Sequence, residues 1–131
     1  MKRVKIDIGF GIKTYTVHLG LYQNGALALY LEDNENIRYF LSTNLGFVPE
    51  DTIYLDINNM PTNIGNILEK LGFGTVSSYI KNSGWIEYPL FFFNDNVIEK
   101  IDYDIAKKYH ENYYENSTKA ILNDYKRDDI Q

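Results

Sequence analysis

The chain contains two histidines, His18 and His110, which are the side chains best suited to acid–base or metal chemistry near neutral pH. They lie far apart in the sequence and in no His-x-x-x-His or His-Glu-x-x-His spacing, so the sequence does not predict a histidine-based zinc site. Cysteine is absent, which excludes disulfides, thiolate metal ligands and a cysteine nucleophile. We therefore interpret both histidines as ordinary solvated side chains.

Motifs for nucleophilic catalysis and nucleotide binding are missing as well. No serine stands in the Gly-x-Ser-x-Gly context of a hydrolase elbow. The Gly-x-Gly segments Gly9–Gly11 and Gly72–Gly74 continue into neither a Gly-x-Gly-x-x-Gly motif nor a P-loop. A catalytic pair of carboxylates leaves no sequence signature, because it is defined by distance in space. The sequence thus favours a protein that is not an enzyme, and a small-molecule enzyme with a non-obvious site stays an alternative.

The acidic residues are unevenly distributed. The segment from Leu21 to Met60 contains six carboxylates and one base, Arg38, and therefore carries the −5 that is also the net charge of the whole chain. A solvated face is the ordinary interpretation of such a cluster. The sharper hypothesis is a surface that mimics the phosphates of nucleic acid and pairs with Arg and Lys of a partner. The candidate partner-binding residues are Glu32, Asp33, Glu35, Glu50, Asp51 and Asp56.

Charge and composition limit the classes of partner. A length of 131 residues with 44% hydrophobic and 24% charged residues is typical of one globular domain. The net charge of −5 argues against direct binding of nucleic acid or of an anionic membrane, but permits docking onto a basic protein surface. No apolar run approaches the roughly 20 residues of a membrane helix. Because the acidic Asp7 interrupts the N-terminal segment, we expect a strand there rather than a signal peptide. We therefore expect a cytoplasmic protein. We also expect that it holds no metal or cofactor.

Alternation of apolar and polar residues predicts strands in the first part of the chain. Val4–Phe10 alternates in this way, and Tyr15–Asn44 is predicted to form a three-stranded antiparallel meander whose first turn is the Asn24-Gly25 dipeptide. Further strands are predicted over Ile53–Ile57, Val76–Ile80 and Trp85–Phe93. The last strand contains Pro89, which lacks an N–H donor, so it should lie at a sheet edge or be bulged.

Two helices are predicted after residue 61. Thr62 is a plausible N-cap for a short helix that carries an apolar stripe from Ile64 to Leu71 and ends at Gly72. A longer helix should start at about Asp95, capped by Asn94 or Asp95. Its apolar face is traced by Ile98, Ile101, Ile105, Tyr109 and Tyr113.

The predicted fold class is α+β, with a twisted antiparallel sheet, one short packed helix and a longer C-terminal helix. The sheet comprises the N-terminal strand, the meander and the further strands, and no linker or repeat divides residues 1–131 into more than one domain. The predicted core residues are Val17, Leu19, Leu27, Leu29, Ile53, Leu55, Ile64, Leu68, Leu71 and Trp85.

Several short motifs resemble those of a family of small acidic proteins of unknown function. This family is carried on conjugative elements, plasmids and phages of low-GC bacteria. Tyr22–Ala28 resembles its Y-x-N-G-x-L-A hairpin, and Ser42–Leu45 is similar to its T-x-N-L signal. Thr52–Asn59 resembles an acidic strand followed by Asn, and Ile64–Gly72 a short helix that ends L-x-x-x-G. Ser83–Pro89 resembles a closing S-G-aromatic-V/I-x-x-P segment.

The resemblance covers residues 12–90, so the N-terminal strand and the helical extension over residues 94–127 are additions to it. Asn34–Asn36 replaces the Gly-Glu-Pro type of turn that the family has at this place. Some small proteins of this background resemble anti-CRISPR inhibitors. The resemblance implies an accessory protein of a mobile genetic element and does not identify its target. Together with the local charge of −5 and the missing catalytic set, it leads to the hypothesis of a non-enzymatic inhibitor, such as an anti-CRISPR protein, that occupies the basic nucleic-acid surface of an RNA-guided nuclease or a similar host-defence machine. The alternative is an assembly accessory protein that self-associates through Trp85–Phe93, whereas the inhibitor would be a monomer or weak dimer.

Overall fold

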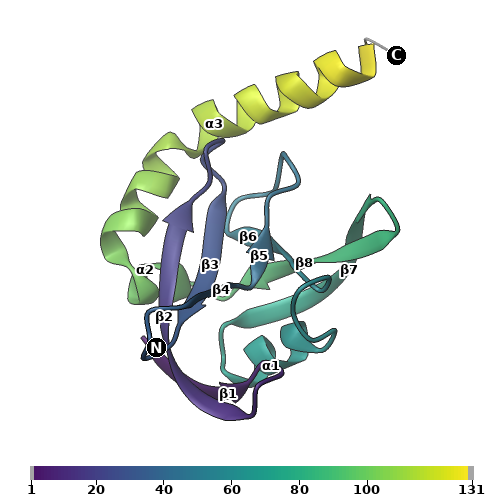
Figure 1. Cartoon of the computed structure of the whole chain (residues 1–131). Coiled ribbons are helices and arrows are strands. Elements are labelled where there is room, and N and C mark those ends of the chain that lie inside the picture. Colours follow the sequence, from purple (N-terminus) through teal and green to yellow (C-terminus); the bar gives the residue numbers. More distant parts are fainter. Residues whose placement is uncertain (1, 130–131) are drawn as a thin grey trace.

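The computed structural model of the chain describes residues 2–129 and confirms the α+β class (Figure 1). Strands dominate the first part of the chain, and helices the last part. The elements are β1 (Arg3–Asp7), β2 (Ile12–Leu21), β3 (Leu27–Glu32), β4 (Arg38–Phe40), β5 (Ser42–Thr43), β6 (Thr52–Leu55), α1 (Ile64–Lys70), β7 (Gly74–Ser83), β8 (Ile86–Phe93), α2 (Val97–Ile101) and α3 (Tyr103–Asp129).

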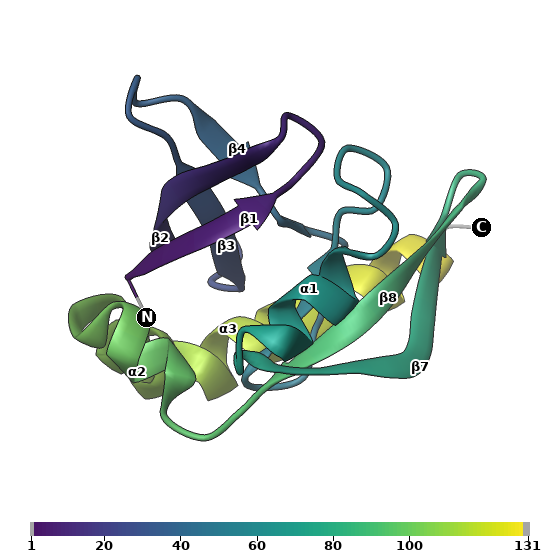
Figure 2. The same cartoon turned by 90° about the horizontal axis from the view of Figure 1, so that it is seen from below.

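The strands form two four-stranded antiparallel sheets and not one continuous sheet. The first has the order β1-β2-β3-β4, so the predicted N-terminal strand and meander are confirmed. The second has the order β5-β6-β8-β7. One apolar cluster contains buried side chains from both sheets and all three helices. In Figure 2, α1 lies between the β1 end of the first sheet and β7 of the second.

The chain passes from the first sheet to the second through Leu41 and Ser42, which are 0% and 2% exposed. The N–H of Leu41 donates to the carbonyl of Leu29 (2.9 Å), as a continuation of β4 would. The N–H of Leu29 then donates to Ser42 Oγ (2.9 Å), which also hydrogen-bonds the hydroxyl of Tyr22 (2.8 Å). A buried side-chain hydroxyl thus provides the acceptor that the neighbouring strand no longer supplies.

The β2–β3 hairpin forms where the sequence predicts it, but with a different turn. Only Gly25 has a positive φ (85°), and its N–H donates to the carbonyl of Tyr22 (2.9 Å). The Tyr22 N–H donates to the carbonyl of Ala26 (2.8 Å), which leaves a three-residue loop with glycine in the left-handed position. A Cβ on Gly25 would lie 2.8 Å from the Cβ of Asn116 in α3, so the helix also requires glycine here.

Eight of the ten predicted core residues are buried, as expected from their alternation and helical spacing. Leu71 is half-buried at the end of α1. Trp85 is 101% exposed, so its prediction as a core residue is wrong. Ser83 pairs with Ile86, which makes Gly84 and Trp85 the two residues of the hairpin turn between β7 and β8. The positive φ of Gly84 (61°) fits the first position of a tight hairpin turn, and the second position points Trp85 away from the sheet.

Pro89 lies in a central strand, because β8 pairs with both β6 and β7, and the prediction of an edge strand is wrong. The alternative, a bulge in the Pro89 strand, is not what the pairing shows, because the extra residues at the irregularity, 77–79, belong to β7. The pairing of β6 with β8 stops at Leu90, one residue before Pro89 would need a donor on that side. On the other side, the register with β7 shifts between Val76 and Ile80.

The first residues of α1 and α2 differ from the prediction, because the predicted N-cap side chains do not cap these helices. Asn63, not Thr62, occupies the N-cap position of α1, without a side-chain hydrogen bond. Neither Asn94 nor Asp95 caps α2, whose N-cap position is taken by Asn96 in the left-handed region.

The predicted longer C-terminal helix is interrupted. Asp102 has extended backbone angles (φ −154°, ψ 102°) and separates α2 from α3. Its Oδ1 accepts the Ile105 N–H (3.0 Å) and caps the start of α3. The predicted apolar face continues across the break, with Ile98 and Ile101 on α2 and Tyr109 on α3 all buried.

The burial of Leu68 and the exposure of Trp85 predict opposite effects of truncation. Leu68→Ala should lower the free energy of unfolding by ~2–5 kcal/mol, because Leu68 is 1% exposed and its removal leaves a cavity. Trp85→Ala should change it by less than ~0.5 kcal/mol, because Trp85 makes no core contact. Urea denaturation of both variants measures the two values. A larger loss for Trp85→Ala than for Leu68→Ala would contradict this assignment of the core.

Candidate functional site

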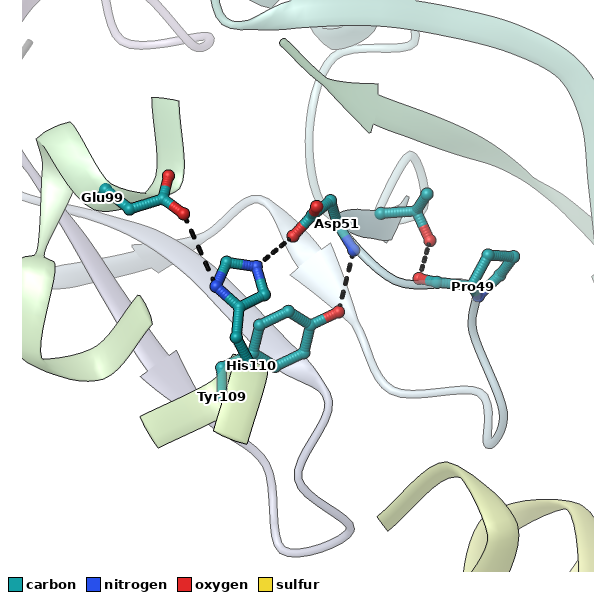
Figure 3. A network of polar contacts seen from close by, with 6 residues as sticks. Pro49, Asp51, Glu99, Tyr109 and His110 are labelled. Atoms are coloured by element: carbon teal, nitrogen blue, oxygen red, sulfur yellow. Dashed lines mark hydrogen bonds and ion pairs between the residues drawn. The ribbon is translucent and has the colours of Figure 1, made fainter. Parts of the chain in front are cut away.

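A cluster of charged side chains joins α2, α3 and the loop before β6 around His110 (Figure 3). The Nε2 of His110 lies 2.6 Å from Asp51 Oδ1. The Nδ1 on the other side of the ring lies 3.5 Å from Glu99 Oε1. The His110 side chain is 30% exposed, so the contacts are only partly screened by water.

The backbone around Asp51 and Asp102 positions this cluster. Asp51 has a positive φ of 61°, a conformation that Asp tolerates better than most residues, and its N–H donates to the hydroxyl of the buried Tyr109 (2.9 Å). The extended conformation of Asp102 changes the chain direction between α2 and α3. Glu99, which precedes this break, can therefore face His110, which follows it (Figure 3).

The charges around His110 favour its protonated form. Burial by itself lowers the pKa of His110. The hydrogen bond and charge of Asp51 outweigh this effect, with further contributions from Glu99 and Glu50, so the pKa of His110 is raised from its ordinary value. Burial also raises the pKa of the neighbouring Tyr109, which keeps its hydroxyl neutral.

The arrangement suits a structural clamp better than a catalytic base. A general base needs a ring nitrogen that faces a substrate, and both nitrogens of His110 face carboxylates. Among the described residues, no group of three or more His, Asp or Glu side chains is arranged to hold a metal ion. The interpretation of both histidines as ordinary solvated side chains is wrong. His18 is half-buried and stacks on Tyr30, and His110 lies between two carboxylates. The sequence does not reveal the contact of His110 with Asp51, because the two residues are 59 positions apart.

The acidic residues of the predicted partner surface lie at three places. Glu32, Asp33 and Glu35 lie at the end of β3 and in the turn to β4. Glu50 and Asp51 lie in the loop before β6, and Asp56 directly follows that strand. The first group therefore belongs to the first sheet, whereas the other two lie at opposite ends of β6 in the second sheet.

Four of these six carboxylates are engaged within the protein. Glu32 pairs with His18 (3.3 Å) and Arg38 (3.6 Å), and Asp51 with His110. The Asp33 side chain accepts hydrogen bonds from the backbone N–H groups of Ile37 and Glu35. These bonds lower the pKa of Asp33, and the bond from Ile37 has the larger effect.

Asp56 is 9% exposed and accepts hydrogen bonds from the N–H and the side-chain amide of Asn59. Glu35 and Glu50 are exposed and make no ion pair with the described residues. These two carboxylates are the members of the predicted surface that need no rearrangement before they contact a partner.

The β7–β8 hairpin, which extends away from the body of the molecule, carries one of three groups of exposed apolar residues (Figure 1). The other two groups lie on α3 and around the strands and turns of the first sheet. Trp85 occupies the turn of the hairpin, and Tyr79 and Ile80 on β7 are 68% and 50% exposed. Lys81 ties the hairpin to the body by donating from Nζ to the carbonyl of Leu45 (2.6 Å). The sequence shows the aromatic run but not its exposure, since hydrophobicity alone does not separate a turn residue from a core residue.

No family model, curated protein or solved structure matches the chain. Within residues 2–129, no helix is both long and apolar enough to cross a membrane.

Protonation of His110 should make part of the stability depend on pH. A histidine whose pKa is raised on folding stabilises the folded state fully below its unfolded pKa of ~6.5, and this contribution is lost as pH rises through the folded pKa. His110→Gln should therefore cost roughly 1 kcal/mol more at about pH 6 than at about pH 9, the value expected for a partly exposed charged hydrogen bond.

Urea denaturation at both pH values measures this difference. Lys119→Gln is the control, because the exposed Lys119 makes an ion pair with Glu115 one helical turn away and with no other described residue. It should cost the same at both pH values. An equal cost of His110→Gln at the two pH values would refute the clamp.

Proposed function

We propose that the protein is a non-enzymatic inhibitor that works by binding a large protein partner through the tip of the β7–β8 hairpin. The observation that carries this proposal is the complete exposure of Trp85 at the turn. Tryptophan is the residue type most enriched among the side chains that dominate protein–protein binding energies, because it buries a large apolar area on contact. Because the Trp85 side chain is wholly exposed, it contributes nothing to the core and is free to be buried by a partner.

The hairpin is ordered before it binds, which lowers the entropic cost of association. Its strands pair at seven positions, and Ser77 Oγ donates to the carbonyl of Leu90 (2.7 Å) where the register shifts. Lys81 fixes the hairpin against the loop that carries Leu45. Tyr79 and Ile80 extend the apolar contact along β7.

The partner that fits is a basic protein, and we propose an RNA-guided nuclease of the host cytoplasm. The resemblance of short motifs in residues 12–90 to a mobile-element family motivates this choice of partner, as does the net charge of −5. The exposed carboxylates of Glu35 and Glu50 are available to the Arg and Lys side chains with which such nucleases hold nucleic acid. The acidic residues then steer the encounter, and the hairpin tip supplies the apolar anchor.

The predicted self-association through Trp85–Phe93 needs an edge strand, but β8 lies between β6 and β7 in the second sheet. The edge strand is the ten-residue β7, with exposed Tyr79 and Ile80, and self-association through β7 is the second candidate. The register shift between Val76 and Ile80 interrupts the regular hydrogen-bonding edge that a second copy would need. An assembly protein would show a mass that rises with concentration in light scattering, whereas the proposed inhibitor stays monomeric.

Removal of the Trp85 side chain should weaken the inhibitor without unfolding it. Trp85→Ala should reduce affinity for the purified, guide-loaded nuclease by about thirtyfold, the effect of losing a central tryptophan anchor. Biolayer interferometry measures the affinity, and a DNA-cleavage assay measures inhibition. Tyr114→Ala is the matched control, because Tyr114 is an aromatic residue on α3 that is 82% exposed. Equal affinities of Trp85→Ala and the unaltered chain would contradict the proposed contact.

Charge reversal tests the acidic contribution separately. The double variant Glu35→Lys, Glu50→Lys should slow association several-fold at low salt and less at high salt, since exposed charges are screened over about 8–10 Å at physiological ionic strength. The unaltered chain should associate more slowly as salt rises. Lys107→Glu, which also changes an exposed charge, serves as a control for nonspecific effects. Association rates independent of both salt and the double substitution would remove the acidic contribution and leave the hairpin contact alone.

A further inference from the structure

The side of the first sheet that faces away from the core carries a row of three aromatic rings. The strand register places His18 of β2 opposite Tyr30 of β3, and Tyr30 opposite Phe40 of β4. The His18 and Tyr30 rings stack at 5.1 Å with 19° between their planes. The Tyr30 and Phe40 rings stack at 4.9 Å with 28° between their planes. These residues form what we call the ring row.

The ring row ends at an open position. β4 is the edge strand of the first sheet, so no strand lies beyond Phe40 on that side. Tyr30 covers one face of the Phe40 ring, and Phe40 is 40% exposed. A flat aromatic group can therefore extend the row by stacking on the other face of Phe40.

The bases on the same face are not all free of partners. Arg3 and Lys5 make no ion pair with the described residues, whereas Arg38 pairs with Glu32 and lies 5.2 Å from the centre of the Tyr30 ring. Arg3, Lys5 and Arg38 are exposed, and Arg38 lies two residues before Phe40 on β4. The two acids of the face are occupied within the sheet and its turn. Asp7 Oδ1 accepts the N–H groups of Gly9 and Gly11. Glu32 pairs with His18 and Arg38.

The face is therefore more positive than the molecule as a whole. Its three bases and two acids leave an excess of one positive charge, whereas the whole chain carries −5. A polyanion that approaches this face therefore meets a small excess of positive charge, although the chain as a whole is acidic. The expectation that the chain does not contact nucleic acid came from the net charge, which does not describe how charge is distributed among faces.

A polar hollow adjoins the ring row. It has a volume of about 530 Å³, and Arg3 and Lys13 contribute cations to its lining, with the hydroxyls of Thr14 and Thr16 between them. Ammonium, guanidinium and hydroxyl groups are the donors that proteins use for phosphate oxygens. Three carboxylates, those of Glu32, Asp33 and Glu35, also line the hollow, so its formal charge is −1 and the proposed phosphate contacts are not placed in it.

We propose that this face binds single-stranded nucleic acid. One base stacks on the open face of Phe40 and extends the ring row, and the following phosphates contact Arg38, Arg3 and Lys5. A base within a duplex has both faces covered by its neighbours, so the strand must be single. Stacking accepts any base, because every base has a π face, and the proposal includes no sequence preference. This surface lies on the first sheet and the hairpin tip on the second, so the proposal is independent of the proposed inhibitor function.

Fluorescence anisotropy with fluorescein-labelled oligothymidylate and oligouridylate at low salt tests the proposal. The full chain should bind at least one of the two probes and bind the corresponding duplex more weakly. Phe40→Leu should weaken binding about tenfold by removing the stacking surface, and Phe40→Trp should restore it. Phe92→Leu is the matched control, because Phe92 is 37% exposed on the second sheet, and it should leave binding unchanged.

The proposed phosphate contacts are tested separately, by the dependence of affinity on salt concentration. Arg38→Gln should lower the slope of log affinity against log salt by about 1, the value for one phosphate contact. A purely structural ring row would predict that Phe40→Leu changes stability alone. No anisotropy change with either probe, or equal affinities of Phe40→Leu and Phe92→Leu, would overturn the proposal. Trp85→Ala should bind both probes normally, so failure of the hairpin contact and failure of this surface are distinguishable.

Discussion

The hydroxyl of Ser42 is the polar contact on which the division into two sheets depends. Leu29 lies in β3 beside the point at which β4 ends at Phe40, so its N–H faces the place where a strand is leaving. A buried N–H without an acceptor costs ~1–3 kcal/mol. Ser42 Oγ accepts that N–H while the backbone of Ser42 already pairs with Leu55 in the second sheet. Ser42 therefore accepts a hydrogen bond from the first sheet with its side chain and pairs with the second sheet through its main chain.

The connection between the two sheets at Ser42 determines which faces of the molecule are left for binding. Both sheets turn their apolar sides toward one shared cluster, so whatever contacts a partner must come from the outer faces, the turns and the helix surfaces. Trp85 is exposed because it belongs to a turn, and the rings of Tyr30 and Phe40 are accessible because they alternate with core residues along their strands. Each proposed surface consists of residues that the core does not use.

Periodicity in the sequence predicts the elements because local backbone geometry produces it. The alternation of Val17 and Leu19 and the helical spacing of Ile64 and Leu68 each place the correct residues in the core. Strand order leaves no such local mark, and the separation into two sheets depends on the contact of Leu29 with a residue 13 positions away.

The candidate site was less predictable for the same reason. The cluster of acidic residues is visible in the sequence, but the ion pairs and hydrogen bonds that these residues make within the protein are not. Asp51 and His110, for example, come together only when α3 packs against the sheets. Asp33 is the exception. Its bonds to Glu35 and Ile37 are local, and an Asp at the start of a polar turn is a recognised signal for them. The misplacement of Trp85 has a different origin, because its assignment to the core relied on hydrophobicity where the turn chemistry of Gly84 should have decided.

The contact between Gly25 and Asn116 has a consequence for the evolution of this chain. Two separate demands fall on Gly25, since its φ of 85° is unfavourable for other residues and a Cβ would collide with the helix. A relative that lacked α3 would keep only the first demand, which asparagine or aspartate can meet in a turn. Drift from glycine to asparagine at this position should therefore accompany loss of the C-terminal helix. In a set of relatives, one column of the alignment would tell which members retain the helix before any of their structures is known.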